Sequence, residues 1–255
     1  MISKRIYNKF AEFLTSAINK PHVKNILLII LFGALLFSTH IGHDVPTGHD
    51  LNFHTRRYMG ISRAIQDGQI IPQLDPAMFN SMGYAPSLFY GPLSGYIALV
   101  SRLIMPNWNT AINFSVILTV ILSGIAMYVF MRKVGKSDTV GLIAGIAYMG
   151  MPYHLMVATR RFAAGENLAF VFAPILFLGL WNIIHKDKQG WLSFGIGLGG
   201  LILSHNLSTI TFVSFAILFA IPYIKQLLNW QSIKQILLGG GICFRCFRFL
   251  YYTIP

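Results

Sequence analysis

A short polar stretch from Gly48 to Arg57 carries the side chains best suited to chemistry. Asp50 precedes a segment that is predicted to form a helix from Leu51 to about Asp67, ended by Gly68, so Asp50 is placed to cap that helix. The helix dipole favours an ionised carboxylate there. An ionised carboxylate can take a proton from an acceptor hydroxyl, which makes Asp50 a candidate catalytic base. The alternative, that Asp50 only caps the helix, fits the spacing equally well.

Other polar side chains accompany Asp50 in this stretch and in the residues before it, where Asp44 lies. His54 lies one helical turn beyond Asp50, and Arg57 lies three residues further, so both are expected on one helix face. A metal site built from His49, Asp50 and His54 is a second interpretation, because histidine and carboxylate are common ligands. The spacing matches no strong metal motif. We therefore expect no metal or other cofactor, with a divalent cation as the alternative.

Two further polar clusters lie later in the chain. Arg160 and Arg161 are followed by Glu166. Arginine binds phosphate through two parallel hydrogen bonds, so a lipid phosphate is a candidate ligand for the pair. Alternatively, Arg161 pairs with Glu166, which would also hold an arginine in place for phosphate. His205 falls in a turn between two short apolar runs, where it either caps the hairpin or lines a site. The predicted substrate-binding residues are His54, Arg57, Arg160, Arg161, Glu166 and His205.

The composition identifies the chain as an integral membrane protein. Of its 255 residues, 55% are hydrophobic and 11% are charged, whereas a soluble domain carries about 25% charged residues. The net charge of +12 comes from basic clusters between apolar runs, a pattern that indicates membrane topology and not nucleic-acid binding. Cys243 and Cys246 form a lone C-x-x-C pair, which is too few ligands for a zinc ribbon.

The apolar runs predict an all-α, polytopic transmembrane helical bundle of about seven spans, since a spanning helix needs about 20 residues. The predicted spans are residues 25–41, 111–131, 139–156, 167–184, 190–205, 207–224 and 235–255. Basic residues before the first span predict a cytoplasmic N-terminus and an outer loop over residues 42–110. The apolar run at 88–105 contains Gly91, Pro92, Gly95 and Arg102. If this run lies at the membrane surface and does not span, the later basic loops fall on the cytoplasmic side, as the charge rule favours. We therefore interpret the run as juxtamembrane.

The two ends of the chain differ from the 25–242 transmembrane region. Residues 1–24 place apolar side chains at steps of three and four, with basic residues on other faces, which predicts a cytoplasmic amphipathic helix at the membrane interface. After Ile242 the sequence places Arg245 and Arg248 into an apolar run, and an arginine in mid-membrane is costly. Residues 243–255 are therefore interpreted as an aberrant or frameshifted tail on a C-terminally truncated chain.

Several motifs in order carry a resemblance to a known family. They include Gly48-His49-Asp50, Gly83-Tyr84-Ala85-Pro86, Arg161 with Gly165-Glu166, and Ser204-His205. Over about residues 25–242 the chain resembles a bacterial family of multi-span membrane proteins labelled 6-pyruvoyl-tetrahydropterin synthase-related. That family is similar to the GT-C class of lipid-linked glycosyltransferases. The sequence shows no zinc-binding histidine set of a soluble pterin enzyme, so the label is not expected to describe an activity.

The resemblance implies a GT-C-like fold in the bacterial cell membrane and a polyprenyl-phosphate-linked sugar as donor at the outer face. The sugar would pass to a glycan or lipid acceptor. In that class an acid just after the first span acts as base, which matches Asp50, and basic residues of a later outer loop hold the donor phosphate, which matches Arg160 and Arg161. The alternatives are a transporter or flippase of lipid-linked glycans and a non-catalytic or truncated membrane protein. Transport would require ionisable groups in mid-membrane or paired broken spans.

Overall fold

Long apolar helices dominate the chain. The computed structural model describes residues 20–40, 48–69, 75, 82–85 and 90–251, with the side chains of 246, 247 and 249–251 left out. Within these residues the regular structure is helical, apart from an isolated antiparallel bridge between Asp75 and Tyr84. The all-α prediction is therefore confirmed. Asp44 and nearly all of the predicted interfacial helix at 1–24 lie outside the described residues.

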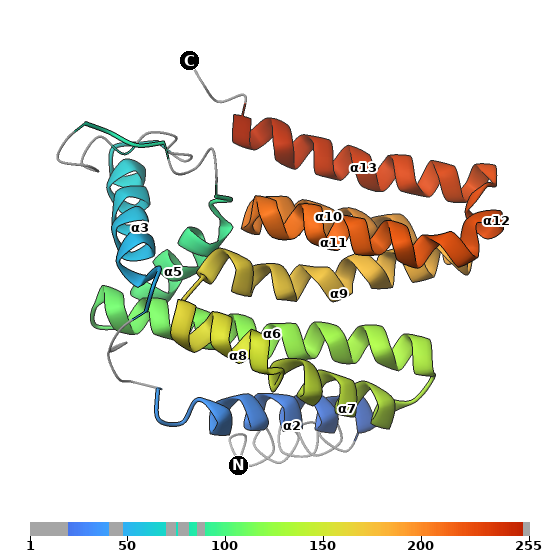
Figure 1. Ribbon diagram of the computed structural model, residues 1–255, viewed down its shortest axis with the longest axis horizontal. Helices are drawn as coiled ribbons and strands as arrows, with labels where there is room; N and C mark the ends of the chain where they lie inside the picture. The colour runs from blue at the N-terminus through green and yellow to red at the C-terminus, as the bar shows by residue number, and fades with distance from the viewer. Residues whose placement is uncertain (1–19, 41–47, 70–74, 76–81, 86–89, 252–255) are drawn as a thin grey trace, which may run out of the picture.

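The helices follow one another along the chain, with short connections from α5 onward (Figure 1). In chain order they are α2 (Pro21–Leu36), α3 (Leu51–Gln66), α5 (Leu93–Arg102), α6 (Trp108–Gly135), α7 (Asp138–Met149), α8 (Pro152–Met156), the π-helical turn η1 (Val157–Arg161), α9 (Ala164–Ile184), α10 (Gly190–Ser204), α11 (Asn206–Ala220), the 3-10 turn η2 (Ile221–Tyr223), α12 (Ile224–Leu227) and α13 (Trp230–Tyr251).

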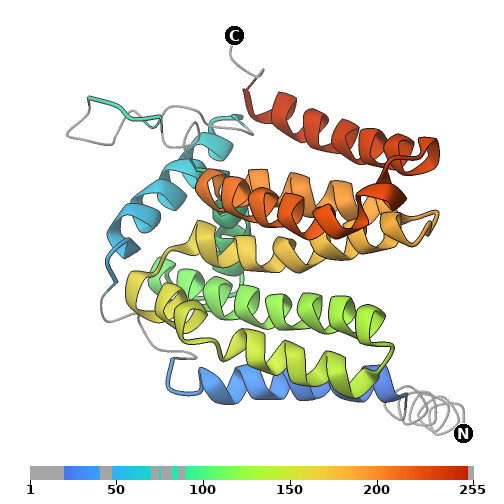
Figure 2. The same ribbon diagram turned by 45° about the vertical axis from the view of Figure 1, so that its right-hand side comes forward.

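The long helices lie side by side in a stack, and α3 crosses one end of it. Figures 1 and 2 show α2 at one edge, then α7 and α6, α9 in the middle, α10 with α11, and α13 at the other edge. The end crossed by α3 is called the α3 end below. At the opposite end the α6–α7 and α9–α10 connections meet, where the Nζ of Lys133 lies 3.1 Å from a carboxylate oxygen of Asp187.

Length and composition make some of these helices candidates for membrane spans. Among the described residues three segments qualify, namely Trp108–Gly135, Ala164–Ile184 and Asn206–Leu227, and a fourth joins Asp138–Met149 to Pro152–Arg161 across a 43° bend. The helices α2 and α10 are apolar but shorter. The predicted seventh span falls on α13, which is outside this set. With ten residues, α5 extends about 15 Å and is too short to cross a bilayer, as predicted for the 88–105 run.

Glycines allow the central helices to approach closely. A Cβ on Gly179 of α9 would lie 2.1 Å from the backbone nitrogen of Phe194 on α10, and one on Gly197 would lie 2.3 Å from that of Leu176. Small residues permit this backbone-to-backbone packing in membrane helices, where dispersion contacts drive association. The helix α9 is accordingly the most buried candidate span, at 72%, and its first turn enters the α3 end in a fixed position.

Candidate functional site

Two segments far apart in the chain meet through their main chains at the α3 end. The amide of His49 donates to the carbonyl of Arg160 at 3.3 Å, and the amide of Asp50 donates to the carbonyl of Arg161 at 2.9 Å. Gly48 makes this approach possible, because a Cβ there would lie 2.7 Å from the Cβ of Phe162. The first two predicted site segments are therefore held together by backbone hydrogen bonds.

The turn that receives His49 and Asp50 has an unusual backbone. The bent α7–α8 segment ends in the π-helical turn η1, and Phe162 follows with φ of 59°, in the left-handed region. Such a conformation is rare for a bulky side chain and is found at turns and functional sites. Phe162 is 2% exposed, so packing holds it there. This reversal starts α9 with Glu166 in its first turn.

Asp50 stands at the N-cap position of α3, as predicted, but its side chain makes no capping hydrogen bond. The carboxylate is half-buried and is close enough to His205 to interact with it electrostatically. The interpretation that Asp50 serves only as a helix cap therefore loses its main support. Its carboxylate remains available for another partner.

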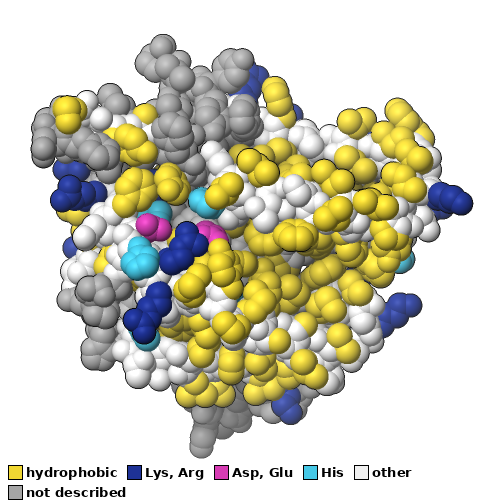
Figure 3. Space-filling view, in the orientation of Figure 1, with side chains coloured by type: hydrophobic (Ala, Val, Ile, Leu, Met, Phe, Trp, Pro, Cys, Tyr) yellow, Lys and Arg dark blue, Asp and Glu magenta, His cyan; other side chains and the backbone are white. Residues whose placement is uncertain are grey.

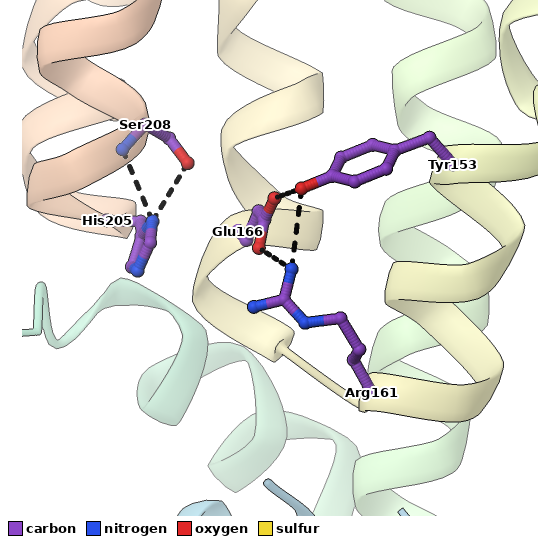
Figure 4. Close-up of polar contacts among 5 residues, drawn as sticks. All are labelled: Tyr153, Arg161, Glu166, His205 and Ser208. Carbon is purple, nitrogen blue, oxygen red and sulfur yellow. Dashed lines mark hydrogen bonds and ion pairs between the residues drawn. The ribbon is translucent and has the colours of Figure 1, made fainter. Parts of the chain in front are cut away.

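Arg161 pairs with Glu166, as one of the two sequence interpretations expected. Its Nη1 lies 2.8 Å from Glu166 Oε2, and the hydroxyl of Tyr153 donates to Glu166 Oε1 at 2.5 Å (Figure 4). The pairing leaves Nε and Nη2 of Arg161 without a hydrogen-bond partner among the described residues. The neighbouring Arg160 side chain is exposed, and no ion pair holds it within the described part of the chain.

His205 both caps a helix and faces the site. Its Nδ1 accepts from the amide of Ser208 at 3.3 Å and lies 2.8 Å from the Ser208 hydroxyl (Figure 4). Burial lowers the pKa of His205, and the nearby Arg161 and Arg57 also lower it, although Glu166 and Asp50 act in the opposite sense. The neutral ring that accepts at Nδ1 carries its proton on Nε2.

Close helix contact brings the His205 turn to the arginine segment. A Cβ on Gly165 of α9 would lie 2.9 Å from the carbonyl oxygen of Ser204. The third predicted cluster therefore joins the first two at the same place. Asp50, Arg161, Glu166 and His205 gather from the α3 start, η1, the α9 start and the α10–α11 turn.

His54 and Arg57 lie beneath this surface. They are 2% and 1% exposed, on one face of α3 as expected. Arg57 donates through Nη2 to the carbonyl oxygens of Tyr90 and Gly91, at 3.1 and 2.5 Å, while its Nε and Nη1 have no hydrogen-bond partner among the described residues. Burial above all, and then Arg57 and His205, lowers the pKa of His54 to about 3. His54 is therefore neutral at physiological pH, and direct ligand contact by either residue stays a prediction.

The space-filling view shows the site as a polar patch on an apolar face. In Figure 3, acidic, basic and histidine side chains gather near the α3 end, while hydrophobic side chains cover most of the remaining face. Among the described residues no group of three His, Cys, Asp or Glu side chains is placed to hold a metal ion. This includes the His49, Asp50 and His54 set of the alternative interpretation.

Basic residues are sorted by type between the two ends. Every described lysine lies at the opposite end, while the described arginines, except Arg132, lie at the α3 end or in the half of α13 that approaches it. When lysine and arginine are counted alike, the described residues place similar numbers of basic side chains at the two ends, and the cytoplasmic N-terminus stays a prediction. The exclusive use of arginine at the α3 end favours phosphate or carboxylate recognition there.

Sequence reasoning did not assign two residues that complete the site. Tyr153 bonds Glu166, and Tyr90 packs its ring 5.7 Å from that of His205. Tyr90 lies in an aromatic-rich stretch that is also typical of a membrane interface. Pro152, which begins α8, was the available signal that the predicted 139–156 span breaks before Tyr153.

Comparison with known proteins gives a family and a long relative. The model of the 6-pyruvoyl-tetrahydropterin synthase related domain, described as a membrane protein, matches residues 88–245. An uncharacterized protein of Lactococcus lactis subsp. cremoris (strain MG1363) is 32% identical over 221 residues, which are 83% of this chain and 36% of the relative. The chain thus spans just over a third of that relative's length. No solved structure matches the chain.

Proposed function

The chain belongs to the 6-pyruvoyl-tetrahydropterin synthase-related family of membrane proteins, and we propose that it takes part in transferring a sugar from a polyprenyl-phosphate donor to a glycan or lipid. The observation that carries this proposal is the main-chain contact of His49 and Asp50 with Arg160 and Arg161. It joins a carboxylate that has no capping bond to two arginines at the end of a membrane bundle. A base and a phosphate-binding group are the two elements that the reaction needs.

In the proposed reaction Asp50 accepts the proton of an acceptor hydroxyl. The hydroxyl oxygen forms a bond to the anomeric carbon of the sugar as the bond from that carbon to the phosphate oxygen breaks. The leaving group is the lipid phosphate, which gains negative charge as it departs. Fixed positive groups that face this developing charge lower the barrier.

The two arginines are suited to the leaving phosphate in different ways. Glu166 holds Arg161 through Nη1, so the guanidinium is oriented before a ligand arrives, and its remaining edge offers Nε and Nη2. That edge matches the two-pronged geometry of arginine–phosphate pairs. Arg160 is exposed and adds positive charge beside it. Glu166 thereby acts as a positioning residue for Arg161.

Transport of a lipid-linked glycan is a weaker candidate. Inside the bundle, the buried His154 places Nδ1 3.0 Å from the carbonyl oxygen of Tyr148 and Nε2 3.1 Å from Asn167 Oδ1. Both nitrogens are thus used in packing the bent segment against α9. The described chain also has a single bent pair of helices in place of the paired broken spans of transporters.

Release of polyprenyl phosphate tests the proposal without knowledge of the sugar, because every donor of this class yields that product. The protein is reconstituted in liposomes with a panel of polyprenyl-phosphate-linked sugars and a bacterial cell-envelope extract as the source of acceptor hydroxyls, and released polyprenyl phosphate is measured. Asp50→Asn is expected to abolish release while donor binding stays within about twofold. Arg161→Gln is expected to weaken donor binding by about tenfold, since a hydrogen bond to a charged group contributes about 1.5 kcal/mol.

Arg63→Gln serves as the matched control, because Arg63 is an exposed arginine on α3 that contacts Asp75 and not the site. It is expected to release polyprenyl phosphate at the wild-type rate. Wild-type release by Asp50→Asn would refute the assignment of the base.

A further inference from the structure

A cavity lies at the opposite end of the bundle, away from the site. Its volume is about 580 Å³, within the usual range for small-molecule sites. Its lining residues belong to the α6–α7 and α9–α10 connections and to the helix ends beside them, and these connections lie at the right in Figure 1. Its lining comes from α6, α7, α9 and α10 and consists of Val129, Arg132, Lys133, Lys136, Ser137, Asp138, Leu178, Asn182, Asp187, Gln189 and Ser193.

The cavity carries an excess of positive charge. Arg132 is paired with Asp138 at 2.6 Å, and Lys133 is paired with Asp187 at 3.1 Å. Both carboxylates are therefore neutralised by these pairs. Lys136 is the fifth charged residue of the lining and makes no ion pair within the described residues, so the cavity retains one net positive charge and attracts an anion.

The polar and apolar parts of the lining are arranged in order along the helix axes. On α6, Val129 lies about one turn closer to the middle of the bundle than Arg132 and Lys133. On α9, Leu178 lies one turn closer than Asn182. Both helices run toward this end, so their apolar lining residues lie nearer the middle of the bundle and their polar lining residues lie nearer its end. An amphiphile with an anionic head matches this arrangement, with its apolar part against Val129 and Leu178 and its head against the polar residues. A free anion would contact only the polar residues.

A buried polar group without a partner points to the same cavity. Asn182 is 8% exposed, and its Oδ1 has no hydrogen-bond partner within the part of the chain that the structure describes. Leaving such a group unsatisfied costs about 1–3 kcal/mol, and a ligand hydroxyl or phosphate oxygen would satisfy the amide, whose oxygen and nitrogen exchange places by a flip. Asn182 lies between the apolar Leu178 and the charged residues of the lining.

We propose that this cavity binds the phosphate headgroup of an anionic phospholipid, with Lys136 and Arg132 facing the phosphate, Asn182 bonding the glycerol region, and Val129 with Leu178 contacting the start of the acyl chains. Basic pockets between transmembrane helices bind anionic headgroups in this manner. The site is separate from the proposed reaction centre, because it lies at the other end of the bundle and shares no residue with it.

Lipid-dependent stabilisation of the purified protein tests this site. The full chain in dodecyl maltoside is titrated with dioleoyl phosphatidylglycerol, with dioleoyl phosphatidylcholine, or with inorganic phosphate, and the melting temperature is followed. Phosphatidylglycerol is expected to raise the melting temperature saturably, while the other two additives leave it unchanged. Ligand that binds the folded state stabilises it in proportion to the logarithm of its concentration over the dissociation constant.

Two variants assign the effect to the cavity. Lys136 has a left-handed backbone with φ of 49°, a conformation that asparagine tolerates, so Lys136→Asn removes the charge with little strain. It is expected to weaken the apparent affinity for phosphatidylglycerol about fivefold. Asn182→Leu is expected to weaken it without lowering the melting temperature of the lipid-free protein, because the replaced amide oxygen has no partner.

Lys186→Asn is the matched control, since Lys186 also has a left-handed backbone, with φ of 59°, lies at the same end and is exposed, but does not line the cavity. Its phosphatidylglycerol affinity is expected to equal that of the wild type. Equal shifts with phosphatidylcholine, an equal shift with inorganic phosphate, or equal losses in Lys136→Asn and Lys186→Asn would each overturn the lipid site.

Discussion

The buried His54 makes the stability of the protein sensitive to mild acid. Its pKa in the folded protein is lowered from 6.5 to about 3, by burial first and then by Arg57 and His205. The unfolded chain takes up a proton near pH 6.5, whereas the folded chain does not. The contribution to stability is therefore complete above pH 6.5 and is lost as the pH falls toward 3.

The expected loss follows from the size of the shift. Each pH unit below the unfolded pKa changes the unfolding free energy by about 1.4 kcal/mol, as long as the folded His54 stays neutral. Between pH 7.5 and pH 5, only the range below pH 6.5 contributes, which is about one and a half units. The titration of His54 is therefore expected to lower the unfolding free energy by about 2 kcal/mol. That is a large fraction of the typical stability of about 5–15 kcal/mol.

Thermal unfolding in detergent between pH 7.5 and pH 5 measures this loss, with His54→Gln as the non-titrating variant. The wild-type curve is expected to fall more steeply than that of the variant by about 2 kcal/mol over the range. Other titrating groups contribute equally to both proteins and cancel in the difference. His185→Gln, which alters an exposed histidine at the opposite end, is expected to follow the wild type. Parallel curves for wild type and His54→Gln would refute the reasoning.

Two further substitutions test the packing that supports the site, each by thermal unfolding. Gly48→Ala is expected to lower the unfolding free energy by about 1–3 kcal/mol, because the new Cβ would lie 2.7 Å from Phe162. Gly240→Ala is the control, because a Cβ there meets open space. Equal melting temperatures for the two variants would contradict the docking of the 48–50 loop. Asn167→Leu is expected to cost about 2 kcal/mol, because the ring of His154 and a carbonyl of α6 lose their buried partner. A loss below about 0.5 kcal/mol would show that this network is not needed.

Local signals in the sequence were sufficient for the elements that hold the site. The predicted helix at 51–67 is observed as Leu51–Gln66, because Asp50 and Gly68 mark its ends through the residue types that such positions favour. The interrupted hydrophobicity of 88–105 also indicated a segment too short to span, and α5 has ten residues, while its juxtamembrane position stays a prediction.

The parts that sequence reasoning missed depend on long-range contacts. The approach of His49 to Arg160 requires the left-handed backbone of Phe162, which is a conformation that its residue type disfavours. The spacing predicted that His54 and Arg57 share a face, but the burial of Arg57 is supported by the carbonyl groups of Tyr90 and Gly91, just before α5. Charged residues are usually exposed, so the residue type alone predicted an exposed Arg57.

The contact between the 48–50 loop and the η1 turn uses main-chain groups on both sides. Its hydrogen bonds do not depend on the side chains at positions 49, 50, 160 and 161, provided that position 48 stays small. The side chains at these positions can therefore be replaced while the main-chain contact is kept. A single codon change can replace an acidic or basic side chain there without loss of the main-chain hydrogen bonds. Such a protein therefore has a short evolutionary route from one chemistry to another.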